Sequence, residues 1–255
     1  MKSTAVITGA TAGIGRVFAD LLAREGHDLV LVARNEERLH TTATEITAAT
    51  GVECEVIVAD LSIREQLDRV AVRVAQDDVD VLINNAGFGL NQRFATGDLE
   101  REQLMLDVLV TAVLRLTHAA VGPMKQRGRG SVVIVSSVAS FIAGGTYSAA
   151  KAWTTVFAES LALELAGSGV KISALCPGFT HTEFHQRAGI NKRAIPNFMW
   201  LNAETMVRDG WRDHQRGKVV TAPGWQYKFL LVLIKLIPRS TVIKFNNRIR
   251  SRNKG

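Results

Sequence analysis

Seven short apolar runs, rich in β-branched residues, recur along this chain, and most are separated by stretches with the period of a helix. Strands that alternate with helices pair in parallel, because each connection has to return along the length of the sheet. The alternation therefore predicts an α/β fold with a doubly wound, parallel, seven-stranded sheet that carries helices on both faces. The runs lie at 4–8, 29–33, 55–59, 79–83, 131–136, 170–176 and 218–221.

Local signals mark where several of the helices begin and end. Asn35 is suited to cap the helix after the second run, and Gly51 is suited to end it. Ser62, with Glu65 three residues later, has the pattern of a capping box at the start of the next helix. The helix after the first run has an apolar stripe of Ile14, Val17, Phe18, Leu21 and Leu22.

The first apolar run ends in TGATAGIG at residues 8–15, directly before that helix. Glycines such as Gly9, Gly13 and Gly15 allow a tight turn and a close approach to a ligand, and the helix N-terminus offers free amides to an anion. Between a strand and a helix, such a loop is typical of sites that bind the pyrophosphate of a dinucleotide. An ordinary glycine turn is the alternative explanation for this loop taken alone.

Tyr147 and Lys151 lie four residues apart, which places a phenol and an ammonium group on one face of a predicted helix. A neighbouring ammonium group lowers the pKa of a phenol from its ordinary value of about 10. We therefore expect Tyr147 to be an effective acid–base group. Ser137 follows the run at 131–136, where its hydroxyl could donate to a carbonyl oxygen on which charge develops.

These motifs, taken in order, resemble those of the short-chain dehydrogenase/reductase family. The motif PGFTHTEF at 177–184, together with the basic and apolar ending after Pro223, resembles its bacterial ketoacyl and mycolate-type reductases. The resemblance implies a Rossmann-like fold with one dinucleotide-binding catalytic domain over 1–222 and a C-terminal extension over 223–255. The matching motifs are TGATAGIG, Asp60 with Leu61, the sequence NNAG from Asn84 to Gly87, Ser137, the pair of Tyr147 and Lys151, and Pro177 with Gly178.

The resemblance also implies roles for individual residues. Tyr147 is the general acid in the reductive direction, Lys151 lowers its pKa and holds the nicotinamide ribose, and Ser137 orients the substrate carbonyl. Asp60 and Leu61 border the adenine. The other implied cofactor-binding residues are Thr8, Gly9, Thr11, Gly13, Ile14 and Gly15 in the first loop, Asn85, Ala86 and Gly87 after the fourth strand, and Pro177, Gly178, Thr180 and Thr182 after the sixth.

The end of the second run indicates which dinucleotide binds. Ala33 stands where a carboxylate would accept a hydrogen bond from the ribose 2′-hydroxyl of NAD. Arg34 follows it, and a guanidinium group can meet the 2′-phosphate of NADP through two parallel hydrogen bonds. We therefore expect NADP(H) as the cofactor. The alternative is a solvent-exposed arginine at the start of a helix.

Two features depart from the family. Leu109 stands where the family has an asparagine that supports a water between the active-site lysine and solvent, and leucine cannot hydrogen-bond that water. The spacing between Ser137 and Tyr147 is shorter than is common, so Ser136 and Ser140 stay open as alternative carbonyl donors.

The segment after Pro177 is rich in aromatic residues, and in this fold the corresponding loop closes over substrate. His181 and His185 have a metal-like spacing but lack a third ligand, so we expect no metal site. The candidates for an apolar substrate pocket are Phe184, Phe198, Met199 and Trp200.

Basic residues gather at the end of the chain. Ten of the 31 follow Asp213 with no acidic residue after it, which leaves 21 basic and 24 acidic residues up to that position. A slightly acidic body lacks the basic surface of a nucleic-acid-binding protein, so we expect no nucleic-acid partner. The segment after Pro223 combines an apolar run, Trp225, Tyr227 and eight basic residues. It suits either a peripheral contact with an anionic membrane or packing on protein.

Other features favour the cytoplasm. No apolar stretch reaches the about 18 uninterrupted residues that span a bilayer, and the N-terminal run is too short for a signal sequence. The two cysteines form no disulfide framework. We expect a cytoplasmic protein, with peripheral contact to a membrane as an open alternative.

Together these features predict an NADPH-dependent reductase that converts a hydrophobic ketone or β-ketoacyl group to a secondary alcohol, in a homo-oligomer as is common in the family. Two alternatives stay open. One is an NADP-dependent dehydrogenase of a small secondary alcohol. The other is a weakly catalytic, membrane-associated protein that binds the cofactor, which Leu109 would explain.

Overall fold

The computed structural model describes residues 3–184 and 195–236 of the 255-residue chain, and it confirms the predicted α/β architecture. In this part of the chain, seven parallel strands form one sheet in the order β3-β2-β1-β4-β5-β6-β7. Six predicted runs agree with strands to within one residue at each end, and the seventh strand is only two residues long. The strands are β1 (Thr4–Thr8), β2 (Asp28–Ala33), β3 (Cys54–Val58), β4 (Val79–Asn84), β5 (Gly130–Val135), β6 (Val170–Leu175) and β7 (Val220–Thr221).

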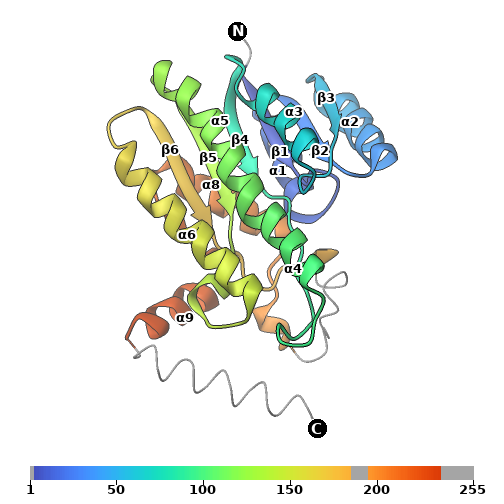
Figure 1. Cartoon of the computed structure of the whole chain (residues 1–255). Helices are drawn as coiled ribbons and strands as arrows, with labels where there is room; N and C mark the ends of the chain where they lie inside the picture. Colours follow the sequence, from blue (N-terminus) through green and yellow to red (C-terminus); the bar gives the residue numbers. More distant parts are fainter. Residues whose placement is uncertain (1–2, 185–194, 237–255) are drawn as a thin grey trace.

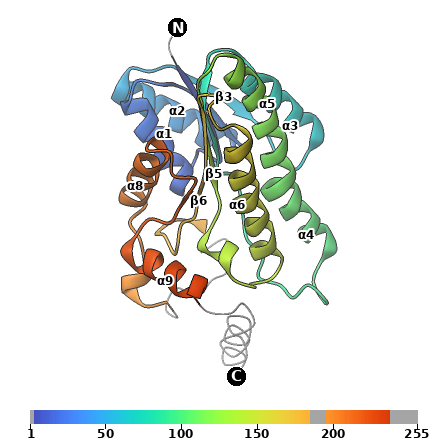
Figure 2. The ribbon, with the colours of Figure 1, turned by 90° about the vertical axis from the view of Figure 1, so that its left-hand side faces the viewer.

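Helices cover both faces of the sheet. They are α1 (Gly13–Arg24), α2 (Glu36–Thr50), α3 (Arg64–Val74), α4 (Leu99–Leu106), α5 (Ala112–Gln126), α6 (Thr146–Glu164), α8 (Ala203–Gln215) and α9 (Trp225–Leu236), with a π-helical turn η1 (Asp107–Thr111) and the 3₁₀ turns η2 (Val138–Phe141) and η4 (Asn197–Met199). Figure 2 shows α1, α2 and α8 on one side of the sheet and α3, α5 and α6 on the other.

Each face of the sheet has its own apolar core. Phe18 of α1 and Trp211 of α8 pack on one face, while Leu116 of α5 and Ala158 of α6 pack on the other. Because the central strands are buried on both sides, their sequences are continuously apolar rather than alternating.

The ends of the helices agree only in part with the sequence signals. Asn35 caps α2 by accepting a hydrogen bond from the Arg38 amide at 2.8 Å, and Gly51 ends the helix with a φ of 75°, as predicted. The predicted capping box at Ser62 is wrong. The Ser62 hydroxyl donates to Asp60 at 2.6 Å instead, and α3 begins after Ile63 without a side-chain cap.

The continuous helix Leu99–Gln126, formed by α4, η1 and α5, is long and apolar enough to cross a membrane by length and composition. In this fold its apolar side chains pack inward, and Met105, Leu109 and Leu116 are almost completely buried. A core helix passes the same composition test, so this helix does not indicate a membrane span.

The strand order reverses direction between β1 and β4. In parallel α/β sheets such a switch point opens a crevice beyond the carboxyl ends of the strands, where ligands bind. In Figure 1 the strands point toward the lower end of the molecule, where α9 also lies. A ligand site is therefore expected among the loops at this end.

Candidate active site

A cavity of about 1370 Å³ lies at the carboxyl ends of the strands. Ligand pockets commonly have about 300–1,000 Å³, so this cavity has room for a dinucleotide and a second molecule. Of the site residues predicted from sequence, those that line it are Gly9, Thr11, Gly13, Ile14, Arg34, Asp60, Leu61, Asn85, Ala86, Gly87, Ser137, Tyr147, Lys151, Pro177, Gly178, Thr180 and Thr182.

The glycine loop forms one end of the cavity. Gly9 and Gly13 have φ values of 68° and 54°, in the left-handed region that favours glycine. Ala12 precedes α1 and makes no side-chain capping bond, which leaves the amides of the first helical turn for an anionic ligand. This arrangement fits the pyrophosphate of a dinucleotide.

Thr8 and Gly15, the two remaining predicted residues, support this loop from behind the cavity wall. The Thr8 hydroxyl accepts hydrogen bonds from the amides of Asn85 and Ala86 at 2.9 and 3.0 Å. The Asn85 side chain in turn donates to the carbonyl oxygens of Thr8 and Gly9. Gly15 lies so close to Gly9 that no Cβ atom fits between them. These residues join the glycine loop to the turn after β4.

Arg34 and Asp60 lie together at the end of the cavity beyond β2 and β3. The Arg34 side chain is 66% exposed, and its Nη1 lies 3.5 Å from Asp60 Oδ2. Burial alone would raise the pKa of Asp60, but the hydrogen bonds from Ser62 and the charge of Arg34 together hold it below its ordinary value. Arg34 is therefore weakly held and accessible to an anion.

Arg38, which is not among the residues predicted from sequence, lines the same end of the cavity. It lies on the first turn of α2, and its guanidinium group binds Glu183 in the loop after β6 at 2.9 and 3.2 Å. A signal was available, because Arg38 follows the Asn35 cap by three residues and so lies near Arg34. Its partner could not be foreseen, since Glu183 is 145 residues away.

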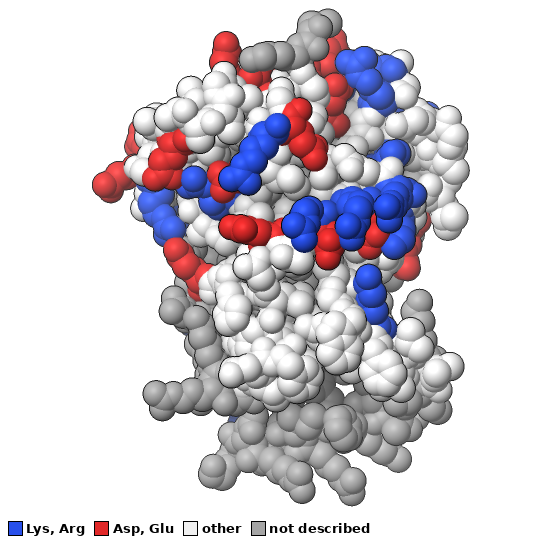
Figure 3. Space-filling model, turned by 180° about the vertical axis from the view of Figure 1, so that it is seen from behind, with Lys and Arg blue, Asp and Glu red and all other residues white. Residues whose placement is uncertain are grey.

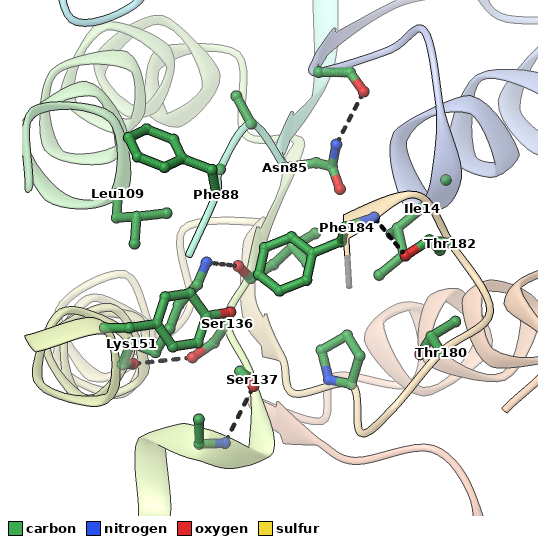
Figure 4. A pocket seen from close by; sticks show the side chains of 18 of the residues that line it. Ile14, Asn85, Phe88, Leu109, Ser136, Ser137, Lys151, Thr180, Thr182 and Phe184 are labelled. Atoms are coloured by element: carbon green, nitrogen blue, oxygen red, sulfur yellow. Dashed lines mark hydrogen bonds between the residues drawn. The ribbon is translucent and has the colours of Figure 1, made fainter. Parts of the chain in front are cut away.

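The loop after β6 faces the glycine loop across the cavity. A Cβ atom on Gly13 would lie 3.1 Å from the Thr182 side chain, so the two loops almost touch. Gly178 has no room for a Cβ atom because the Tyr227 ring of α9 packs against it. In Figure 4, Thr180 and Thr182 lie on one side of the pocket and Leu109 and Phe88 on the other.

The three predicted catalytic side chains meet at the middle of the cavity. Lys151 Nζ lies 5.9 Å from the centre of the Tyr147 ring and donates to the carbonyl oxygen of Val135 at 2.7 Å. The Ser137 hydroxyl hydrogen-bonds with Tyr147 and accepts the amide of Ala139 at 3.1 Å. Both β5 and α6 are anchored in the core, so these groups are held by rigid elements.

The pKa of Tyr147 departs from the sequence expectation. Burial raises it to about 12, and the hydrogen bond from Ser137 offsets only part of this effect. Burial also lowers the pKa of Lys151 to about 8. The Lys151 ammonium group donates to the Val135 carbonyl, and burial dominates the pKa of the Tyr147 phenol, so the lowering of this pKa by Lys151 stays a prediction.

The structure distinguishes between the three candidate serines. The Ser136 hydroxyl donates to the Lys151 carbonyl oxygen at 2.9 Å and also bonds to Thr155 at 2.7 Å, so it is committed to α6. Ser140 does not line the cavity, whereas Ser137 does. The geometry therefore favours Ser137 as the carbonyl donor.

Leu109 lies within the π-helical turn η1 and is 1% exposed. It packs with Met105 and Ala150, and with the partly buried rings of Phe88 and Tyr147. A π-turn often marks a functional position in a helix. Here an apolar side chain occupies it, next to Tyr147.

The half of the cavity beyond Tyr147 is apolar. Phe184 and Met199 line it as predicted, and the Phe184 ring lies 5.9 Å from that of Tyr147. Phe198 is 63% exposed and Trp200 stacks on His181, so these two predictions are wrong. Further apolar residues line this half without having been predicted from sequence, namely Phe88, Leu104, Val108, Ile142, Leu230 and Ile234.

His181, one of the two histidines with metal-like spacing, stacks on the Trp200 ring with a centroid distance of 4.8 Å. Position 185 lies outside the described residues. Among the residues that the structure describes, no group of three or more His, Cys, Asp or Glu side chains gathers as a metal site.

A sequence profile described as short chain dehydrogenase matches residues 3–193. The very-long-chain 3-oxoacyl-CoA reductase of Anas platyrhynchos is 31% identical over 266 aligned residues, which cover 97% of this chain and 81% of the relative. The putative ketoacyl reductase of Streptomyces coelicolor is 37% identical over 191 residues, covering 71% of this chain and 72% of the relative.

Solved structures with a similar fold belong to the same family. A short-chain dehydrogenase from Sphingobium yanoikuyae, solved in complex with NADPH, superimposes with a TM-score of 0.84 and 32% identity. The match covers 93% of this chain and 97% of that protein. The predicted resemblance to short-chain dehydrogenases, and to ketoacyl reductases among them, is therefore confirmed.

Proposed function

The chain belongs to the short-chain dehydrogenase/reductase family and is an oxidoreductase, and on this basis we propose that it reduces a hydrophobic ketone or β-ketoacyl group with NADPH. One observation carries the proposal. The Tyr147 phenol lies beside Ser137 and Lys151 where the dinucleotide half of the cavity meets its apolar half. A carbonyl group placed there reaches a proton donor from an apolar site.

The residues divide the reaction between them. The nicotinamide cofactor, when bound, supplies a hydride to the carbonyl carbon. The Ser137 hydroxyl donates a hydrogen bond to the carbonyl oxygen, which takes the electron pair of the breaking π bond. Tyr147 is a neutral phenol at neutral pH and gives its proton to this oxygen. The ammonium group of Lys151 then stabilises the phenolate and helps to hold the cofactor ribose.

The preference for NADPH rests on Arg34, whose exposed guanidinium group lines the cavity where a ribose 2′-phosphate would lie. Arg34→Ala should weaken the binding of NADPH by about 1.5–3 kcal/mol, the value of a hydrogen bond to a charged group, and should leave NADH binding almost unchanged. Fluorescence titration with both cofactors measures this difference. Equal losses for both would show that Arg34 is structural.

The substrate class follows from the apolar half of the cavity. Its lining includes Leu230 and Ile234 of α9. Two similar proteins are named as reductases of acyl substrates, a very-long-chain 3-oxoacyl-CoA reductase and a putative ketoacyl reductase. We infer that a long or bulky apolar group occupies this half.

A panel of ketones and β-ketoacyl thioesters of increasing chain length tests the proposal, with loss of NADPH absorbance as the readout. We expect kcat/KM to rise with chain length, because each buried methylene group contributes about 0.8 kcal/mol of transfer free energy. Turnover limited to oxidation of small secondary alcohols would favour the small-substrate alternative. Tight NADPH binding without turnover of any compound would favour the weakly catalytic one.

We also propose that α9 makes a peripheral contact with a membrane in an otherwise cytoplasmic protein. Its inner face packs on the body, where Tyr227 is 1% exposed and donates to the Met199 carbonyl oxygen at 2.6 Å. Its outer face exposes Trp225, Phe229 and Leu236 by 61–76%. In Figure 3 the lower part of the described surface is mostly uncharged. The basic residues after Pro223 favour an anionic surface.

Vesicle binding tests this contact. Replacing Trp225 and Phe229 by serine should reduce binding to anionic vesicles, and salt should reduce it further because the attraction is screened. Leu163→Ser is a matched control, since Leu163 is 80% exposed on α6 away from α9. Unchanged vesicle binding with an altered oligomeric state would mean that this face packs on a second copy.

A further inference from the structure

The ion pair between Arg38 and Glu183 joins two distant parts of the cofactor half of the cavity. Arg38 Nη2 lies 2.9 Å from Glu183 Oε1, and Nη1 lies 3.2 Å from Oε2, so both ends of the guanidinium fork are engaged. Nη2 also donates to the carbonyl oxygen of Thr11 in the glycine loop at 3.3 Å. One side chain thus connects α2, the glycine loop and the loop after β6.

This pair is well formed but accessible. The Arg38 and Glu183 side chains are 41% and 44% exposed, and an ion pair at such a site contributes only about 0–1 kcal/mol. A phosphate dianion offers the same guanidinium fork more charge and more acceptor oxygens than a carboxylate does. A phosphate that reaches Arg38 can therefore displace Glu183.

The position of Arg38 is suited to such a phosphate. Arg38, Arg34 and Thr11 line the same end of the cavity, and Arg34 is the residue that our proposed function already assigns to the ribose 2′-phosphate. Both arginines lie against carboxylates in this structure, Arg34 near Asp60 and Arg38 on Glu183. Two arginines on one phosphate are electrostatically favourable, whereas a phosphate next to Glu183 is not.

We propose that Arg38 is a second recognition residue for the adenosine 2′-phosphate, and that Glu183 occupies its guanidinium group until the phosphate replaces it. The inference rests on the proposed preference for NADPH. Glu183 then sharpens cofactor choice, because a ligand without the phosphate cannot take Arg38 from it. Glu183 lies between Thr182, which faces Gly13, and Phe184, whose ring lies against Tyr147. A shift of Glu183 on phosphate binding would therefore also move the neighbouring Phe184, whose ring lies against Tyr147.

The test uses two adenosine ligands that differ only in this phosphate, adenosine 2′,5′-bisphosphate and 5′-AMP, with calorimetric Kd values for the full-length protein. Arg38→Gln should weaken the bisphosphate at least about ten-fold and change 5′-AMP less than two-fold. Glu183→Gln should tighten the bisphosphate several-fold without affecting 5′-AMP. The double variant should bind the bisphosphate with the same Kd as Arg38→Gln alone, because without the arginine Glu183 no longer competes with the phosphate.

Arg16→Gln is the matched control. Arg16 also forms an ion pair with a glutamate, Glu45, at 2.7 Å, but it does not line the cavity, so both affinities should stay at their original values. Arg38→Lys is a second variant, which keeps the positive charge but lacks the two-pronged guanidinium group. Its affinity for the bisphosphate should lie between that of Arg38→Gln and that of the unchanged protein. It also serves if Arg38→Gln does not fold.

The outcomes separate this inference from the proposed function. If the unchanged protein binds both ligands equally, the preference for NADPH fails and this inference fails with it. If the bisphosphate is preferred and Arg34→Ala abolishes the preference while Arg38→Gln does not, only the inference about Arg38 is overturned. If Glu183→Gln weakens the bisphosphate, Glu183 supports the site rather than competing with the phosphate, and the inference is overturned as well.

Discussion

Replacing Leu109 by asparagine tests one of the two departures from the family that the sequence indicates. Leu109 is 1% exposed in an apolar cluster with Met105 and Ala150. It also lies near Lys151, because a Cβ atom on Gly87 would be 2.7 Å from Leu109 Cδ2 and 3.9 Å from Lys151 Nζ. An amide at this position could therefore order a water beside Lys151.

The cost to stability can be worked from this packing. Loss of the buried leucine side chain removes about 1.5–3 kcal/mol of burial free energy. An asparagine amide without hydrogen-bond partners would add about 1–3 kcal/mol to the destabilisation. We expect a total near 2 kcal/mol if the amide is satisfied by water and backbone groups, and near 4 kcal/mol if it is not.

The effect on turnover depends on how Tyr147 regains its proton. If proton resupply limits the rate, a water held by the amide should raise kcat and reduce its solvent isotope effect. Denaturant unfolding, kcat in H₂O and kcat in D₂O measure the three quantities. Leu109→Ala is the control, because it removes the packing without adding an amide, at a cost of about 2–5 kcal/mol.

A folded Leu109→Asn variant with unchanged kcat and an unchanged isotope effect would refute the reasoning. It would show that Leu109 is a packing residue and that another step, such as product release, limits turnover. An unchanged protein with almost no activity that gains turnover from the asparagine would support the weakly catalytic alternative.

Three further predictions concern the protonation of Tyr147, Lys151 and His214. Tyr147→Phe should abolish turnover and leave NADPH binding within about two-fold by fluorescence titration, because the phenol delivers the proton without building the dinucleotide site; retention of most of the rate would contradict the assignment. Because burial lowers the pKa of Lys151 to about 8, reductive kcat/KM should fall as pH rises through that value, and Lys151→Arg should remove this fall if it retains activity. Burial lowers the pKa of His214 to about 4 from 6.5, so the unfolded state binds its proton first as pH falls. Stability should decline between these two values by about 3 kcal/mol in total, and much less in His214→Asn, as read from urea unfolding at each pH.

Most of the fold and of the dinucleotide loop could be predicted because their signals are local. A buried parallel strand is a continuous apolar run, and a glycine loop before a helix lies within eight residues. The Asn35 cap is equally local. The Ser62 cap failed because Asp60, only two residues away, offered its hydroxyl a better acceptor.

The parts of the site that could not be predicted depend on long-range contacts. The position of the Arg38 side chain depends on its ion pair with Glu183. The apolar half of the cavity includes Leu230 and Ile234, which come from a helix near the end of the chain. The pKa of Tyr147 depends on the fold for the same reason. Sequence spacing places an ammonium group nearby, but only the fold shows that this group donates to Val135 and that burial dominates.

These long-range contacts meet in one short segment, the loop after β6. At one end the amide of Phe179 donates to the Tyr227 hydroxyl of α9 at 2.8 Å, and at the other Glu183 binds Arg38. Between them Thr182 faces the glycine loop, and the Phe184 ring lies against that of Tyr147. A displacement of this loop would therefore alter the cofactor half, the proton donor and the helix that lines the substrate half together. If phosphate binding releases Glu183 from Arg38, the first effect on the substrate half should be transmitted through Phe184, and a Phe184 substitution should uncouple cofactor choice from substrate affinity.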